Sequence, residues 1–219
     1  MMHSFKVQNQ SPWIVDLYNK YFPNKNNGFL VEIGVGHTLD GIDNIVDGTL
    51  DKIKNISRCG SNTADLLDLG WSGIYIEPVL EYCDEAKISH LNNFDRLKII
   101  NIAAGDISDK IQMFLGDSFI PNDHGNRGYA WIGREVEIQP TSKILSDNGC
   151  PKNIDLMSID VEGFEGKVIK GIDFNIHTPN MMVIEINIIS LDEVSNLLPK
   201  EYKFIKSDNL NAVWVNTKK

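Results

Sequence analysis

Short apolar runs alternate along the chain with segments whose apolar residues recur at helical spacing. The apolar runs predict buried strands at Phe29–Ile33, Gly73–Ile76, Leu97–Ile102, Ile154–Ile159 and Met181–Ile186. Helical patterns separate most of them, at Leu80–Leu91, Thr141–Ser146 and Glu165–Lys170. Strands that alternate with helices favour a parallel sheet covered by helices on both faces, which is a doubly wound, Rossmann-like α/β fold.

The two ends of the chain extend this pattern. Ser11 and Pro12 predict the N-cap and the first position of a helix, and Ser61 predicts the cap of a second helix that runs to Leu69. The strands Tyr202–Lys206 and Ala212–Val215 are too close in sequence for a parallel crossover, so we expect an antiparallel hairpin. No linker interrupts the pattern, and we therefore expect a single domain over residues 1–219.

Two strand ends carry residues that suit a nucleoside-containing ligand. The first strand ends in Glu32-Ile33-Gly34-Val35-Gly36, where glycines let the backbone approach a ligand closely. The second strand ends at Glu77-Pro78, and a carboxylate at that position can accept hydrogen bonds from both hydroxyls of a ribose. In open α/β sheets the carboxyl ends of the strands form the ligand-binding edge.

The segment after the third strand is expected to border an adenine ring. Ala103 and Ala104 leave room for the ring, and Asp106 can accept a hydrogen bond from its exocyclic amine; the same residues also suit a plain turn. A dinucleotide is the alternative ligand, and it would make the chain a nicotinamide-dependent oxidoreductase. The dinucleotide fingerprint needs a third glycine where this chain has Leu39, which disfavours that alternative.

Four segments together resemble the FkbM-type methyltransferases. They are Ser61-Asn62-Thr63, Gly70-Trp71-Ser72-Gly73-Ile74, Ile76-Glu77-Pro78 and Ser158-Ile159-Asp160-Val161-Glu162-Gly163. The resemblance implies the class I methyltransferase fold, with S-adenosylmethionine (SAM) as methyl donor and O-methylation, often of sugar hydroxyls in glycans or natural products. It also implies that Glu32, Gly34 and Gly36 border the methionine end of SAM, that Glu77 holds the ribose and that Asp160 faces the methyl group.

The full set of residues expected at the cofactor combines these two lines of reasoning. It consists of Glu32, Gly34, Val35, Gly36, Ser61, Asn62, Glu77, Pro78, Ala103, Ala104 and Asp106. The chain departs from its relatives in one respect, because residues 37–60 separate the glycine turn from Ser61-Asn62-Thr63. Arg58, within that insertion, is a candidate partner for the methionine carboxylate by its charge, and its interpretation as a solvated loop residue is the favoured one.

Three carboxylates are predicted to meet on the rim beside the cofactor. Asp160 and Glu162 follow the fourth strand, and Glu185 ends the fifth; Asp160 is the candidate general base that takes the proton of an acceptor hydroxyl. Glu162 has a second interpretation, as the first residue of the next helix. A divalent cation held by Asp160, Glu185 and Asn187 is a further alternative, and we do not favour it.

Residues 116–135 are expected to form a long irregular loop. Tyr129 and Trp131 could stack on a sugar ring while Arg127 or Arg134 binds its oxygens, and His124 is an alternative base. An ordinary surface loop, anchored by its aromatic side chains, explains the same residues.

Net charge and the length of the hydrophobic runs argue against nucleic acid and a membrane as partners of this chain. The net charge of −9 makes nucleic acid an unlikely partner on electrostatic grounds, because that binding depends on clustered Lys and Arg. The three cysteines form no CxxC pair, which favours a reducing, cytoplasmic setting, and the run Met181–Ile189 is too short to cross a membrane. A SAM- or nucleotide-binding module without catalysis remains an alternative, although binding alone gives no reason to gather three carboxylates.

Overall fold

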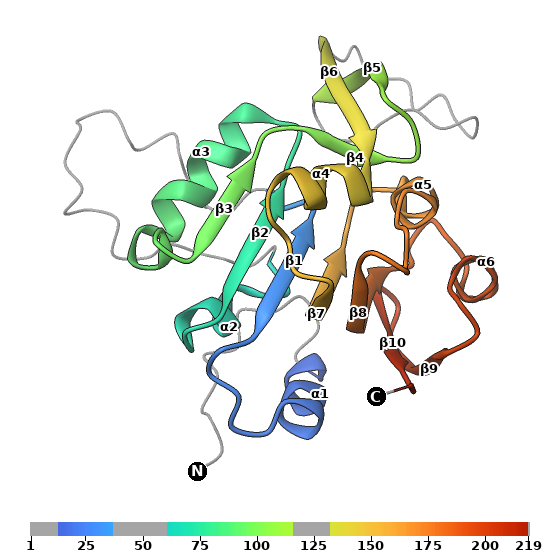
Figure 1. Cartoon of the computed structure of the whole chain (residues 1–219). Helices are drawn as coiled ribbons and strands as arrows, with labels where there is room; N and C mark the ends of the chain where they lie inside the picture. Colours follow the sequence, from blue (N-terminus) through green and yellow to red (C-terminus); the bar gives the residue numbers. More distant parts are fainter. Residues whose placement is uncertain (1–12, 37–60, 116–131, 219) are drawn as a thin grey trace.

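The central element is a seven-stranded sheet, whose strands lie side by side across Figure 1. The computed structural model describes residues 13–36, 61–115 and 132–218. The strand order is β3-β2-β1-β7-β8-β10-β9, and the strands are β1 (Phe29–Ile33), β2 (Ser72–Ile76), β3 (Leu97–Ile100), β7 (Asn153–Ile159), β8 (Thr178–Glu185), β9 (Tyr202–Ser207) and β10 (Asn211–Asn216). The first five are parallel, and β10 is antiparallel to both β8 and β9. The predicted doubly wound sheet and its C-terminal hairpin are both confirmed.

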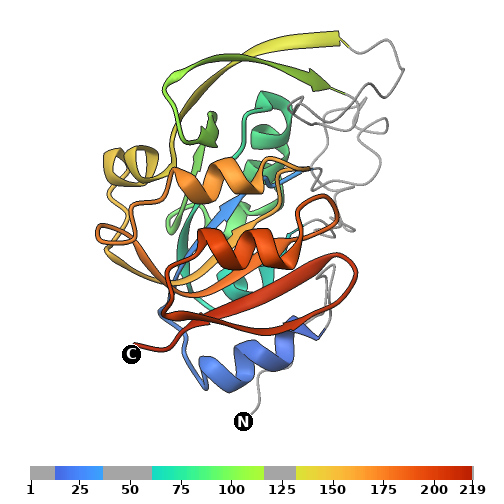
Figure 2. The same cartoon turned by 90° about the vertical axis from the view of Figure 1, so that its right-hand side faces the viewer.

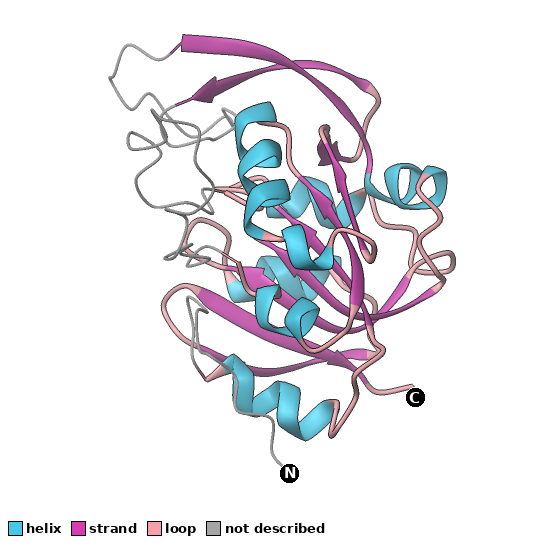
Figure 3. Ribbon diagram, turned by 90° about the vertical axis from the view of Figure 1, so that its left-hand side faces the viewer, coloured by secondary structure: helices cyan, strands magenta, loops and turns pink. Residues whose placement is uncertain are grey.

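Helices cover both faces of this sheet. Strand residues alternate between the two: Leu30 packs with α1 (Ile14–Tyr21), α2 (Ala64–Asp68) and α3 (Leu80–Ser89), whereas Val31 packs with α4 (Thr141–Asp147), α5 (Glu165–Lys170) and α6 (Leu191–Leu197). Figure 2, viewed from the side of the C-terminal hairpin, shows α4, α5 and α6 on one side of the sheet and α1 on the other, and Figure 3 shows the molecule from the opposite direction. The apolar strand runs are thus explained by burial on both sides.

A second sheet of three strands is an unpredicted feature. Its order is β4-β6-β5, with β4 at Ala103–Gly105, β5 at Asp109–Leu115 and β6 at Ile132–Pro140. One face of it is apolar, since Met113, Val136 and Ile138 are buried with Val79 from the start of α3. The sheet lies beyond the carboxyl ends of β1, β2 and β3 (Figure 1), on the side where a ligand is expected.

This second sheet corrects two predictions. The third central strand ends at Ile100 rather than Ile102, and the following Ala-Ala-Gly segment is strand β4 instead of a turn, because it pairs in parallel with Ile138–Pro140. The loop predicted over 116–135 is also too long, because Ile132–Glu135 belong to β6 and pair with β5. In both places the residues form a strand because a partner strand far away in the sequence supplies the backbone hydrogen bonds.

Helix limits differ by a few residues from those predicted. Helix α3 ends at Ser89 rather than Leu91, and a short 3₁₀ turn follows at Leu91–Asn93. Helix α2 starts after Ser61, whose hydroxyl accepts from the Ala64 amide at 3.0 Å. Residues 11 and 12 lie outside the described part of the chain. Among the residues that the structure describes, no helix is both long and apolar enough to span a bilayer.

Candidate active site

The strand order reverses between β1 and β7. Backbone hydrogen bonds join the segment after β7 to the end of β1, and the segment after β1 to the end of β2. The Asp160 amide donates to Ile33 O at 2.9 Å, and the Gly34 amide donates to Ile76 O at 3.0 Å. Gly34 and Gly36 have φ of +82° and +58°, which favours glycine at both positions. A Cβ on Gly34 would lie 1.6 Å from Asp160 O, so the glycine is also required by the close approach of the two segments.

Glu77 faces the glycine turn, as its predicted role requires. Its Oε2 accepts from the Val35 and Gly36 amides at 3.0 and 3.4 Å, and its Oε1 accepts from the Val79 amide at 2.8 Å. Burial raises the pKa of this carboxyl group, while the three amide donors oppose that rise. A carboxylate has about four acceptor sites. Holding both ribose hydroxyls therefore requires Glu77 to give up one amide, and the Gly36 contact is the longest.

Glu32 is engaged by protein groups instead of being open to a ligand. Its Oε2 accepts from the hydroxyls of Ser61 and Thr63 at 2.7 and 2.6 Å, and its Oε1 accepts from the Asn62 amide at 2.8 Å. Burial raises its pKa, and these donors stabilise the charged form. The carboxylate thus fixes residues 61–63 against β1. Asn62 itself is buried, and its side-chain oxygen has no hydrogen-bond partner in the described structure.

The residues predicted to border adenine lie at the junction of the two sheets. Ala103 and Ala104 are buried in β4, and Pro78 precedes the start of α3. Asp106 follows β4, and its carboxylate lies 3.4 Å from Lys167 Nζ on α5. This ion pair gives Asp106 a partner that the sequence did not indicate.

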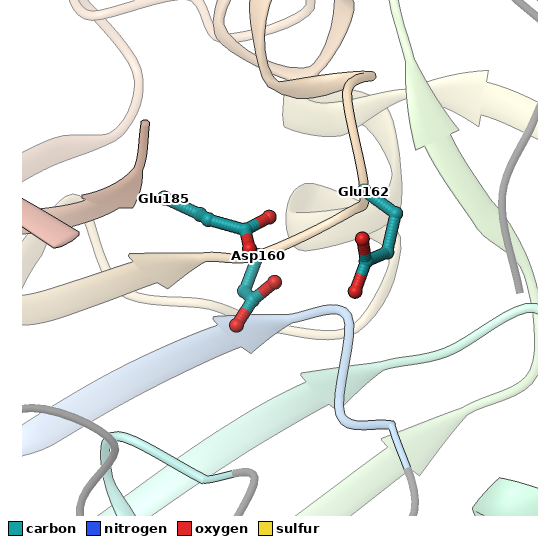
Figure 4. A group of neighbouring side chains, drawn as sticks. All are labelled: Asp160, Glu162 and Glu185. Carbon is teal, nitrogen blue, oxygen red and sulfur yellow. The ribbon is translucent and has the colours of Figure 1, made fainter. Parts of the chain in front are cut away.

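The three predicted rim carboxylates are brought together by the fold. Asp160 follows β7, Glu162 lies in the turn beyond it, and Glu185 ends β8; one carboxylate oxygen from each lies within 4.8 Å of the others. Figure 4 shows the three side chains pointing toward one another. Glu162 has φ of +54°, a strained conformation for a residue with a side chain, and the helix it was expected to start begins only at Glu165.

Glu185 is the most enclosed of the three carboxylates, with 4% of its surface exposed. Its Oε1 accepts from Asn187 Nδ2 at 2.6 Å, and no donor in the described part of the chain reaches its Oε2. Asn187, expected among the ligands of a cation, thus turns its N–H toward Glu185. The alternative of a cation held by Asp160, Glu185 and Asn187 would require Asn187 to turn its amide oxygen toward that cation.

Asp160 and Glu185 form a pair of neighbouring carboxyl groups, and the pKa values of both lie above those of ordinary carboxyl groups. Burial raises the pKa of Asp160 to about 7, with the Glu162 charge adding to the rise and a hydrogen bond with Glu185 opposing it. Burial and the Asp160 charge raise the pKa of Glu185 to about 10. The pair therefore retains a proton at neutral pH, because two adjacent buried carboxylates cannot both remain ionised cheaply.

Glu165 is a site residue that the sequence interpretation missed. It is fully buried, and its Oε1 accepts from the Val161 and Gly163 amides at 3.1 and 3.0 Å, on both sides of Glu162. The carboxylate thereby holds the turn that carries Asp160 and Glu162. A glutamate at a helix start is ordinarily solvated, so the sequence offers only its position two residues after a glycine as a signal.

Of the remaining candidates, Arg134 is the one that the structure describes, and it lies on β6. Arg134 forms a two-pronged ion pair with Glu81 on α3, with N–O distances of 2.6 and 2.8 Å, and this pair lowers the pKa of Glu81 to about 2. Arg134 thus has a partner other than a sugar. Arg58, His124, Arg127, Tyr129 and Trp131 lie outside the described residues.

Comparison with known proteins gives a family and a fold. The model of the methyltransferase FkbM domain matches residues 51–207. Among solved structures, methyltransferase FkbM from Methylobacillus flagellatus KT has a TM-score of 0.52 at 15% identity, over 87% of this chain and 44% of that one. The chain thus spans less than half the length of that relative.

Two other solved structures are more distantly similar. An O-methyltransferase from Bacillus cereus, in complex with SAH, has a TM-score of 0.46 at 11% identity over 98% of this chain and 84% of that one. The fibrillarin pre-rRNA processing protein of Methanococcus jannaschii has a TM-score of 0.48 at 11% identity over 90% and 70% of the two chains. Curated protein sequences give no significant match.

Proposed function

Because the chain belongs to the FkbM methyltransferase domain family, its fold is that of a class I SAM-dependent methyltransferase, and we propose that it methylates a hydroxyl group of a sugar or glycan. The observation that carries the proposal is the Asp160 carboxylate, which lies where the strand order reverses and has a pKa raised to about 7. We further propose that residues 1–219 act as one domain.

SAM fits the edge formed by the carboxyl ends of β1, β2 and β7. The glycine turn at Gly34–Gly36 gives the cofactor a surface without side chains, and Glu77 is the ribose acceptor beside it. Asn62 offers a buried oxygen that accepts no hydrogen bond from the described residues, which suits the ammonium group of the methionine portion. Ala103, Ala104 and Asp106 complete the adenine side.

Asp160 has the chemistry needed at the methyl end. Methyl transfer is an in-line displacement at a carbon already activated by the sulfonium, so the protein must align the acceptor and accept its proton. A general base works best when its pKa lies near the working pH, and a pKa of about 7 meets that condition. Glu162, partly exposed on the same rim, would accept a hydrogen bond from a second hydroxyl of the acceptor.

A sugar is the proposed acceptor because its neighbouring hydroxyls can donate to a rim of carboxyl oxygens, and an ionised carboxylate acts solely as a hydrogen-bond acceptor. The resemblance to FkbM-type enzymes supports the same substrate class. Neutral sugars also avoid the repulsion that a phosphorylated or carboxylated acceptor would meet beside three acidic groups.

The test is methyl transfer from SAM labelled on the methyl group to a panel of mono- and oligosaccharides, with matched amine and thiol compounds as controls. We expect label in an O-methyl ether of at least one sugar. Transfer to nitrogen or sulfur alone would overturn the proposed hydroxyl acceptor. Thermal stabilisation by a nicotinamide cofactor but not by SAM would overturn the methyl donor, because a bound ligand stabilises by mass action.

A further inference from the structure

We propose that Glu185 is a positioning residue that carries a proton on Oε2 and donates it in a hydrogen bond to Asp160, so that Asp160 is the anion of the pair. This inference rests on the proposed function for its catalytic meaning. Its physical basis is independent of any acceptor, because it concerns where one proton lies in the protein alone.

The hydrogen bond from Asn187 decides which oxygen carries the proton. Asn187 Nδ2 donates to Glu185 Oε1 at 2.6 Å, so Oε1 must be an acceptor. The other oxygen, Oε2, is buried and receives no donor from the described residues. A protonated Oε2 removes this unsatisfied position, because it becomes a donor itself, and Figure 4 shows the carboxyl group directed toward Asp160.

The surroundings favour a proton on this pair over two negative charges. Among the described residues, the charged groups that act on it are acidic: Glu162 in the turn after β7, Glu165 on α5 and Glu32 on β1. Less of the surface of Glu185 than of Asp160 is exposed to solvent, and loss of contact with water penalises the ionised form. Asp160 keeps the charge because it is nearer solvent and accepts the hydrogen bond from Glu185, which lowers its pKa.

The proton arrangement gives the reaction a defined path. The acceptor hydroxyl transfers its proton to Asp160 as its oxygen forms a bond to the methyl carbon. The bond from that carbon to the sulfonium sulfur breaks, and its electron pair stays on sulfur, which becomes a neutral thioether. Glu185 neither gains nor loses a proton in this step; its O–H holds the Asp160 carboxylate in one orientation.

Glu185→Gln is the decisive variant, because a glutamine side chain copies a protonated glutamate. Its carbonyl oxygen accepts from Asn187, and its N–H donates to Asp160. We expect kcat within about threefold of wild type and an unchanged acidic limb of the pH profile. Glu185→Ala, which cannot donate, should lower kcat by about 10–100-fold with little change in SAM affinity, as is typical when an orienting partner is lost.

A second readout needs no acceptor and no activity. The pKa of Glu185 is raised on folding, so this group binds a proton more tightly in the folded state, and its contribution to stability falls as pH rises from about 4.5 toward 10. Glutamine does not titrate. We therefore expect the melting temperature of Glu185→Gln to rise relative to wild type as pH increases over that range, whether or not a methyl acceptor is known.

Two results would overturn the inference. Parallel pH profiles of melting temperature for wild type and Glu185→Gln would mean that Glu185 holds no proton. Binding of Mn²⁺ to the wild type, measured on the metal alone by its electron spin resonance and lost in Glu185→Gln, would mean that a cation takes the place of the proton. Failure of the sugar screen, with the melting difference present, would refute the proposed function and leave the proton assignment standing.

Discussion

Alanine substitutions at the two glycines of the β1 turn separate the roles of backbone conformation and close packing. Gly34 and Gly36 both have positive φ, and a left-handed conformation costs an alanine about 1–2 kcal/mol at either position. Their surroundings differ. The Gly36 Cβ would meet no described atom within 4 Å, whereas the Gly34 Cβ would lie 1.6 Å from Asp160 O.

The size of the effect at Gly34 follows from what must move. The Asp160 backbone would have to shift by about 2 Å to reach ordinary contact with the new methyl group. That shift breaks the Asp160 bond to Ile33 O and strains the Gly34 bond to Ile76 O, and each buried group left unpaired costs about 1–3 kcal/mol. With the conformational cost added to that of the two unpaired groups, we expect Gly34→Ala to lose roughly 3–8 kcal/mol of folding stability.

The assay is urea unfolding followed by circular dichroism, with the free energy extrapolated to water. Gly36→Ala is the matched control, and we expect it to lose only about 1–2 kcal/mol while its methyl group weakens SAM binding. A loss at Gly34 no larger than that at Gly36 would refute the close approach of the β1 and β7 segments, on which the geometry of the site depends.

Three further predictions concern the site itself. Glu77→Ala should weaken SAM by about 1.5–3 kcal/mol for each ribose hydrogen bond lost, and unchanged affinity in calorimetry would reject the ribose contact. The rate kcat should rise with pH through about 7, because the Asp160 pKa is raised to that value and only the ionised form is a base; a flat profile would argue against it. Activity should survive exhaustive chelation, and its loss with recovery on adding Mg²⁺ would indicate a cation at the carboxylates.

The sequence predicted the central sheet because its strands are buried on both faces and are therefore rich in apolar residues, as in the run Met181–Ile184. Strand β4 escaped prediction because its three small residues have no apolar pattern and it exists only by pairing with Ile138–Pro140. Residues 116–131 separate β5 from β6, so no local turn signal linked them as a hairpin.

Within the site, the sequence predicted which side chains lie close together but not which protein groups they bind. Asp160, Glu162 and Glu185 follow adjacent strand ends, and the fold brings them together as expected. The sequence could not indicate that Glu32 accepts hydrogen bonds from the Ser61 and Thr63 hydroxyls, because the partners of a buried carboxylate are set by tertiary packing. For the same reason, the sequence could not indicate that Glu165 accepts hydrogen bonds from the Val161 and Gly163 amides in the turn after β7.

The most direct test of the central claim is a paired measurement on wild type and Asp160→Asn, in which SAM affinity is determined by calorimetry and methyl transfer to the identified sugar by single turnover. Asparagine keeps the size of the side chain and cannot take a proton. We predict equal SAM affinity and a transfer rate lower by about 10²–10⁴-fold in the variant. Transfer at the wild-type rate by Asp160→Asn would contradict the account.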